Sequence, residues 1–163
     1  MTFVVRAATN ADLDQVADVY LESWRAGYAD LLEPDILDQQ LAQRASYNWQ
    51  DAIARDRVLV VTDGARVAGV AHIKSHHPSD RGLWIEMFYV RSSAWGTGAA
   101  TALLDAVLSD ARASGHEAIW LNVVEEQERA RRFYERQGWH IDIEAEPQTN
   151  GLFPLLTYRM DLS

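Results

Sequence analysis

The segment VRSSAWGTGAATALL, residues 90–104, gathers glycines and other small residues where a strand is expected to pass into a helix. Backbone amides at a helix N-terminus attract anions, and a glycine, which lacks a Cβ, lets a phosphate come close to them. A P-loop would need Lys after the second glycine, where this chain has Ala99, and a dinucleotide fingerprint would need Gly or Ala in place of Thr101. A tight turn without a ligand is the remaining alternative.

Glu86 is the carboxylate best placed for chemistry, within an apolar run at 83–90 that indicates a strand. Strand alternation puts it on the same face as Trp84 and Phe88, so we expect it on an active face as a candidate general base. An ordinary exposed or paired carboxylate explains the same pattern equally well.

The chain contains no cysteine, which excludes disulfides, thiolate metal sites and a cysteine nucleophile. His76, His77 and Asp80 match no strong metal-ligand spacing, so we interpret them as a polar loop and expect no metal. The formal net charge is -9, which disfavours nucleic acid as a partner. An acidic surface can steer a cationic ligand, although it also serves solubility.

Membrane attachment and secretion are not expected. No apolar stretch approaches the roughly 20 residues that cross a bilayer. The N-terminal MTFVVRAATNADLD lacks the charged segment of a signal peptide. We therefore expect a cytoplasmic protein, and its 163 residues without linker or repeat indicate one domain over 1–163.

Hydrophobic periodicity predicts the elements that must position these residues. Helical spacing is expected at 13–24, 34–53 (a region that can be broken once), 103–111 and 130–134, and strands at 3–6, 57–62, 66–74, 83–90, 118–124, 139–143 and 155–160. Thr9 and Asp12 form a capping-box pattern, and Asp63-Gly64 is a hairpin turn signal. The helix after Val90 must cross back, so the strands on either side of it are predicted to be parallel. The order predicts an α/β fold with a mixed, mostly antiparallel twisted sheet of about seven strands and helices on both faces.

Two signatures, in the right order, resemble those of the GNAT acetyltransferase superfamily. Trp95-Gly96-Thr97-Gly98-Ala99-Ala100, after a strand ending Phe88-Tyr89-Val90, resembles the acyl-CoA pyrophosphate loop Gln/Arg-x-x-Gly-x-Gly/Ala. The segment from Gln127 to Tyr134, followed by Gly138-Trp139, resembles Asn-x-x-Ala-x-x-Phe-Tyr with its Gly-aromatic ending. The start of the chain, including Ser23–Tyr28, resembles a bacterial branch of the family. Trp95 and Gln127 depart from the signature residues.

This resemblance implies an acetyl-CoA-dependent N-acetyltransferase, a single GNAT-type domain with a parallel, splayed strand pair at the acyl-CoA site. A strand amide would polarise the thioester carbonyl, an amine would attack directly, and Tyr134 would protonate the leaving thiolate, unless Tyr134 is a core aromatic. The residues implied to bind the cofactor are Phe88, Tyr89, Val90, Trp95, Gly96, Thr97, Gly98, Ala99, Ala100, Thr101, Gln127 and Tyr134.

The acceptor is expected to be a small-molecule primary amine or a peptide amine. The residues expected to bind it are Trp24, Tyr28, Trp84 and Glu86, although each of these aromatic side chains can equally be core. Homodimers are common in the family, and the sequence leaves the oligomeric state open. A catalytically silent acyl-CoA-binding sensor or interaction domain is the alternative function, and the presence of Tyr134 favours the enzyme.

Overall fold

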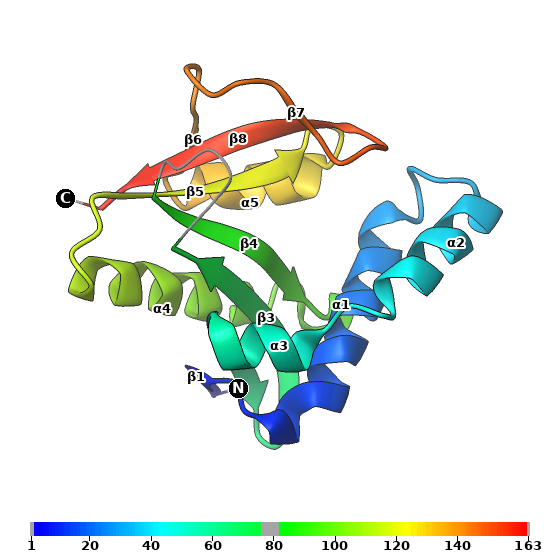
Figure 1. The fold of residues 1–163 in the computed structure, drawn as a ribbon, viewed down its shortest axis with the longest axis horizontal. Coiled ribbons are helices and arrows are strands. Elements are labelled where there is room, and N and C mark those ends of the chain that lie inside the picture. The colour runs from blue at the N-terminus through cyan, green and yellow to red at the C-terminus, as the bar shows by residue number, and fades with distance from the viewer. Residues whose placement is uncertain (1, 76–81, 163) are drawn as a thin grey trace. The chain divides into compact units, whose positions relative to one another are not determined.

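The computed structural model describes residues 2–75 and 82–162 (Figure 1). The chain forms two compact units, which are Met1–Ile73 with Met87–Leu108 and Lys74–Glu86 with Ser109–Ser163. The boundaries fall inside strand β3, Arg66–Lys74, strand β4, Leu83–Val90, and helix α4, Ala99–Ala113, so these three elements contribute to both units.

The first unit contains an antiparallel set of strands, β1 Phe3–Ala7, β2 Arg57–Asp63 and β3 Arg66–Lys74, in the order β1-β2-β3-β4. The turn predicted at Asp63-Gly64 is confirmed, and Gly64 adopts a φ of +62°, as such hairpins require. All five residues of β2 between Arg57 and Asp63 are buried, which is why this strand is β-branched and apolar throughout instead of alternating.

Helices α1 Leu13–Tyr28, α2 Pro34–Arg44 and α3 Trp49–Arg55 complete this unit, with a short 3-10 turn at Asn10–Asp12. The capping box is confirmed, since the Thr9 amide donates to Asp12 Oδ2 over 2.8 Å. Pro34 occupies the first turn of α2, where a missing N–H costs nothing. The break in the second helical region is also confirmed, because Asn48 Oδ1 accepts the Asp51 amide at 3.0 Å and so caps a new helix.

The second unit follows the strand order β4-β5-β8-β6, with β5 Ala118–Val124, β6 His140–Ile141, β7 Gln148–Thr149, β8 Pro154–Asp161 and helix α5 Glu128–Arg136. β5 is parallel to β4 and antiparallel to β8, while β6 and β7 both pair antiparallel with β8. The strand predicted over 139–143 is too long. It ends at Ile141 because the Asp142 carboxylate accepts both the Trp120 indole N–H and the Glu144 amide, which starts a turn.

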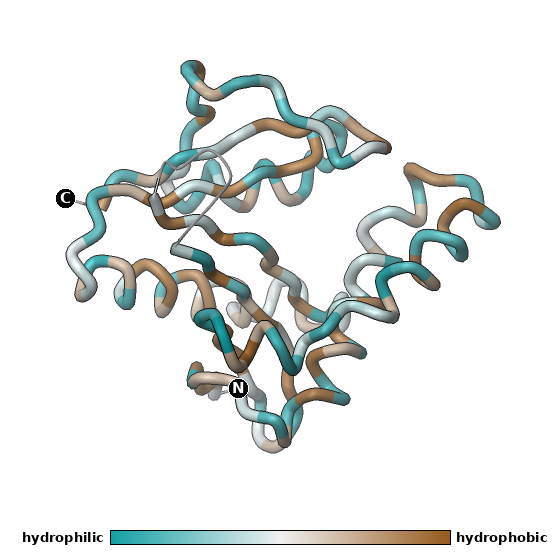
Figure 2. The backbone as a smooth tube through the Cα atoms, in the orientation of Figure 1, coloured by the Kyte–Doolittle hydropathy of each residue, from teal (hydrophilic) through white to brown (hydrophobic). Residues whose placement is uncertain are grey.

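Together the described residues form an α/β fold whose mixed sheet has eight strands and is mostly antiparallel, with a parallel β4–β5 pair. This confirms the predicted fold class, and the two-residue strand β7 accounts for the extra strand. Figure 2 shows hydrophobic and hydrophilic residues alternating along the helices, as helices with one buried face require. None of the helices in residues 2–75 and 82–162 is both long and apolar enough to cross a membrane.

Candidate functional site

The glycine-rich segment connects β4 to α4 through a 3-10 turn at Ser92–Ala94. Gly96 and Gly98 have φ of +75° and +98°, a region that other residues rarely adopt, so the loop needs glycine at both positions. The Ala102 amide donates to Gly98 O at 3.0 Å and is the first rung of the α4 ladder. The amides of residues 99–101 therefore precede the ladder, which is the arrangement that accepts an anion.

Space above Gly98 is open. A Cβ built there would meet only Phe3 Cε2, at 3.9 Å, which is ordinary contact. The loop is therefore not crowded by its own chain, and a pyrophosphate can approach the amides of Gly96 to Thr101. The described residues thus fit the group that the sequence predicts at this turn.

Trp95 and Thr97 stabilise the loop from within. The Trp95 indole Nε1 donates to Val90 O at 3.0 Å, which folds the side chain back on the last residue of β4. The Thr97 hydroxyl donates to Ala94 O and accepts the Ala99 amide at 3.4 Å. Trp95, where the family has Gln or Arg, thus has a local structural contact that explains its presence.

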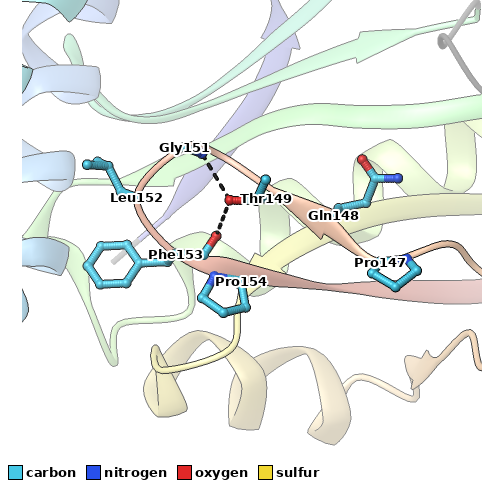
Figure 3. Close-up of a pocket in the computed structure, with 7 residues that line it drawn as sticks. All are labelled: Pro147, Gln148, Thr149, Gly151, Leu152, Phe153 and Pro154. Carbon is cyan, nitrogen blue, oxygen red and sulfur yellow. Dashed lines mark hydrogen bonds between the residues drawn. The ribbon is translucent and has the colours of Figure 1, made fainter.

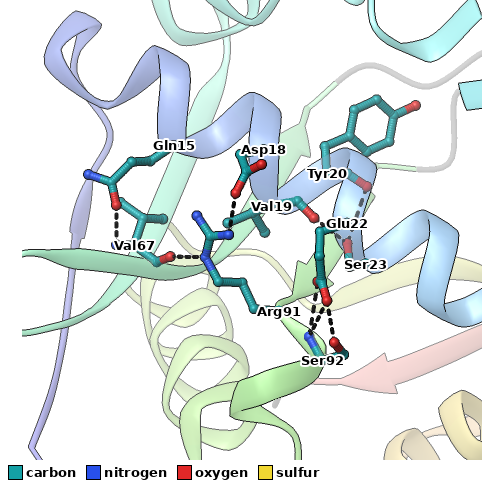
Figure 4. Close-up of polar contacts among 9 residues, drawn as sticks. All are labelled: Gln15, Asp18, Val19, Tyr20, Glu22, Ser23, Val67, Arg91 and Ser92. Carbon is teal, nitrogen blue, oxygen red and sulfur yellow. Dashed lines mark hydrogen bonds and ion pairs between the residues drawn. The ribbon is translucent and has the colours of Figure 1, made fainter. Parts of the chain in front are cut away.

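Two acidic residues of α1 hold the start of this loop (Figure 4). Arg91 is 6% exposed, donates from Nε to Val67 O at 2.7 Å, and pairs with Asp18. One turn along α1, the Glu22 carboxylate accepts the Ser92 amide at 3.0 Å and the Ser92 hydroxyl. Sequence reasoning missed this network, because the two acidic residues lie 73 and 70 residues from their partners and carry no local signal.

The aromatic residues predicted on α1 are buried, with Trp24 2% and Tyr28 7% exposed. Their rings stack with centroids 3.9 Å apart, and the Arg44 guanidinium lies 4.0 Å from the Trp24 ring centroid. The structure thus places a cation of the chain itself against the Trp24 ring, in a cation–π contact that sequence reasoning missed.

The strand residues predicted beside the pantetheine arm lie in the first unit at the end of β4. Phe88 and Tyr89 are half-buried and Val90 is buried. The Tyr89 ring lies 5.2 Å from the ring of Tyr20, which is one helical turn before Trp24 on α1. Within the first unit the structure thus brings this strand end and α1 together.

In the second unit, Trp84 and Glu86 differ in exposure. Trp84 is 4% exposed and stacks against Trp120 with ring centroids 6.0 Å apart, whereas Glu86 is exposed. The parallel register joins Leu83–Ile85 of β4 to Ile119–Leu121 of β5, so Glu86 is the first β4 residue beyond it. Trp84 is therefore part of the core, and Glu86 is accessible.

Tyr134 lies on α5 and is 7% exposed, with ring centroids 5.2 Å from Phe133, 5.8 Å from Trp139 and 6.5 Å from Tyr158. This burial raises the pKa of the Tyr134 phenol well above its usual value, so the hydroxyl keeps its proton at neutral pH. Gln127 is half-buried and precedes α5, and its carbonyl accepts the Arg131 amide at 3.1 Å. Both signature residues therefore belong to one helix and its start.

A hollow of about 350 Å³ lies at the β7–β8 turn, lined by Pro147, Gln148, Thr149, Gly151, Leu152, Phe153 and Pro154 (Figure 3). The Thr149 hydroxyl shapes it by donating to Phe153 O at 3.0 Å and accepting the Gly151 amide at 3.1 Å. None of the predicted site residues lines it. We therefore attribute this hollow to the turn and assign it no role in the chemistry.

His76, His77 and Asp80, interpreted as a polar loop, lie outside the described residues. Among residues 2–75 and 82–162, no group of three or more His, Asp or Glu side chains is arranged to hold a metal ion.

Comparisons with known proteins agree with this geometry. The model of the acetyltransferase (GNAT) family matches residues 13–139. An uncharacterized N-acetyltransferase from Mycobacterium tuberculosis is 33% identical over 88 residues, which cover 54% of this chain and 55% of that relative. The match thus spans about half the length of the curated relative.

Solved structures share the fold over nearly the whole chain. The PaiA N-acetyltransferase from Thermoplasma acidophilum, in complex with coenzyme A, has a TM-score of 0.81 and 17% identity, covering 96% of this chain and 98% of that chain. YncA from Salmonella typhimurium, solved with acetyl-CoA, has a TM-score of 0.68 and 17% identity, covering 100% of this chain and 95% of that chain.

Proposed function

Because the chain belongs to the acetyltransferase (GNAT) family, we propose that it is a single-domain N-acetyltransferase that transfers the acetyl group of acetyl-CoA to a primary amine. The observation that carries this proposal is the loop from Gly96 to Thr101. It combines two positive-φ glycines, open space above Gly98 and amides that precede the α4 ladder. These features suit the pyrophosphate of an acyl-CoA.

Acetyl-CoA supplies an activated thioester, and the protein has to present it to a neutral amine. Direct attack is the natural route, because the chain has no cysteine on which to store the acetyl group. We propose that the β4 backbone beyond Ile85, which the parallel register with β5 does not use, provides the amide that polarises the thioester carbonyl.

The acceptor decides whether a base is needed. Deprotonating a lysine-like amine with a pKa of about 10.4 costs about 4.6 kcal/mol at pH 7, whereas an α-amine near 7.8 costs about 1.1 kcal/mol. Exposed Glu86 is our candidate to orient the amine or take its proton. If Glu86 is that base, Glu86→Gln should lose more rate with high-pKa amines than with α-amines, and equal losses would reduce Glu86 to a positioning role.

Tyr134 is proposed to protonate the leaving thiolate. Its phenol carries a proton at neutral pH, which is the form that a general acid needs. On the acceptor side, we propose that the α1 segment with Trp24 and Tyr28 supports the amine site from within the core, since both rings are buried. The acceptor class is a small primary amine or the amine of a peptide end.

The test measures free thiol released from acetyl-CoA across a panel of amines, together with calorimetric binding of acetyl-CoA. Every thiol detected must come from the cofactor, because the protein contains none. Binding with amine-dependent thiol release supports the transferase. Binding without release with any amine supports the acyl-CoA sensor, and the absence of binding contradicts both.

A further inference from the structure

A continuous hydrogen-bonded chain of three titratable side chains lies in the first unit. The His72 ring, in β3, is 1% exposed and bonded at both nitrogens. Its Nε2 lies 2.8 Å from Asp56 Oδ2, at the end of α3, and its Nδ1 lies 3.1 Å from the hydroxyl of Tyr47, which precedes α3. The chain thus runs from a half-buried carboxylate, through a fully buried imidazole, to a half-buried phenol.

The chemistry of Asp56 fixes the direction of this chain. An ionised carboxylate only accepts, so Nε2 of His72 must carry the proton of the bond to Asp56. In a neutral imidazole, Nδ1 is then an acceptor, and the Tyr47 hydroxyl donates to it. The Tyr47 oxygen is consequently an acceptor toward any further partner.

Tyr47 also lies beside helix α1, whose residues Trp24 and Tyr28 are proposed to support the acceptor site. Its ring centroid is 5.8 Å from that of Tyr20 and 4.9 Å from that of Trp49. Tyr20 is one turn before Trp24 on α1 and contacts Tyr89 of β4.

A second observation indicates that this cluster binds a polar group. Trp49 is 4% exposed, and its buried indole Nε1 has no hydrogen-bond partner among the described residues. A buried donor without a partner is destabilising, so such groups normally meet a ligand or an ordered water. Trp49 therefore offers this cluster a hydrogen-bond donor that the described residues do not fill.

We propose that Tyr47, His72 and Asp56 form a proton relay that deprotonates the acceptor ammonium in place of Glu86, an inference that rests on the proposed transferase function. An N–H bond of the ammonium breaks and its proton passes to the Tyr47 oxygen. The hydroxyl proton of Tyr47 passes to Nδ1 of His72, and the resulting imidazolium is paired with the Asp56 carboxylate. Tyr47 is the catalytic residue, and His72 and Asp56 act through it.

The charges around the relay are compatible with this direction. Among the described residues, His72 contacts Asp56, Tyr47 and the neutral Trp49 ring. Beyond Tyr47 lies Tyr20, whose phenol pKa is raised by burial, so it stays neutral, although nearby Arg44 opposes this shift. The Asp56 carboxylate is therefore the anion that directly pairs with a charged His72.

The kinetic test compares Tyr47→Phe with Tyr20→Phe, a matched control that removes a hydroxyl from a ring in the same cluster. Both keep the ring packing, and urea unfolding with acetyl-CoA affinity confirms that each variant is folded. With a high-pKa amine, Tyr47→Phe should lower kcat/KM about 10- to 10²-fold and change its pH profile, as loss of a base does. Tyr20→Phe should keep the wild-type profile. An unchanged profile in Tyr47→Phe, or the same change in both variants, overturns the relay while leaving the transferase intact.

A second readout needs no acceptor. Nitrogen NMR of ¹⁵N-histidine-labelled protein distinguishes the tautomers of His72, with His72→Gln identifying its signals. A proton on Nε2 and an unprotonated Nδ1 support the relay. A neutral ring with its proton on Nδ1 overturns it, because Tyr47 would then be an acceptor, and this holds whether or not an amine is acetylated.

Discussion

Replacing Gly98 with Ala should separate the backbone strain of the loop from its role in binding. Gly98 has a φ of +98°, and Gly115, after the other end of α4, has a φ of +82°. A built Cβ meets only Phe3 at 3.9 Å in the first case and nothing within 4 Å in the second. Neither substitution creates a clash, so each should act through backbone strain alone. That strain should lower the free energy of unfolding by about 1–2 kcal/mol.

The two variants should differ in their affinity for acetyl-CoA. At Gly98 the strained backbone shifts, and the new Cβ stands where the phosphate approaches the amides. Losing one hydrogen bond to a charged group costs about 1.5–3 kcal/mol. Since 1.36 kcal/mol corresponds to a factor of ten, the dissociation constant should rise about 10- to 10²-fold for Gly98→Ala. Gly115→Ala should bind as the wild type does.

Calorimetric titration with acetyl-CoA measures the affinity, and urea unfolding measures the stability of each variant. Gly115→Ala is the control, because it carries comparable strain outside the predicted site. If neither variant weakens binding, the pyrophosphate does not lie on this loop. If the two lose affinity equally, the loss reflects general destabilisation, and the argument from the open space above Gly98 fails.

Two further predictions concern a catalytic group and a structural anchor. Tyr134→Phe should lower turnover about 10- to 10³-fold with nearly unchanged acetyl-CoA affinity, and an unaffected rate would make Tyr134 a packing residue. Arg91→Leu should cost about 1–3 kcal/mol in urea unfolding, because it leaves Val67 O without its buried donor. Asp18→Asn should cost at most about 1 kcal/mol, because the Asp18 side chain is 66% exposed, and equal costs would contradict this asymmetry.

Local chemistry explains why much of the fold could be predicted. Three features act within a few residues and can therefore be recognised in the sequence. They are the Thr9–Asp12 capping box, Pro34 in the first turn of α2 and the Asp63-Gly64 turn. The strand predicted over 139–143 failed for the opposite reason. It is cut short by Asp142, whose partner Trp120 lies 22 residues away in the chain.

The polar contacts that anchor the loop could not be predicted, because they join distant segments. An exposed and a buried arginine look alike in sequence, and only the fold brings Arg91 under α1 to meet Asp18 and Val67 O. The same holds for His72, whose partners Asp56 and Tyr47 lie 16 and 25 residues away in the chain. Sequence spacing found the backbone features of the site and missed the side chains that three-dimensional packing assembles.

Arg44 places a positive charge beside Trp24, a residue proposed to support the acceptor site. The net charge of -9 suggested attraction for a cationic acceptor, but that charge is a property of the whole chain. Locally, the Arg44 guanidinium lies 4.0 Å from the Trp24 ring centroid. A fixed positive charge repels a second cation placed near it. An ammonium bound beside Arg44 would therefore lose its proton more readily than in water, so the guanidinium favours the neutral amine that attacks a thioester.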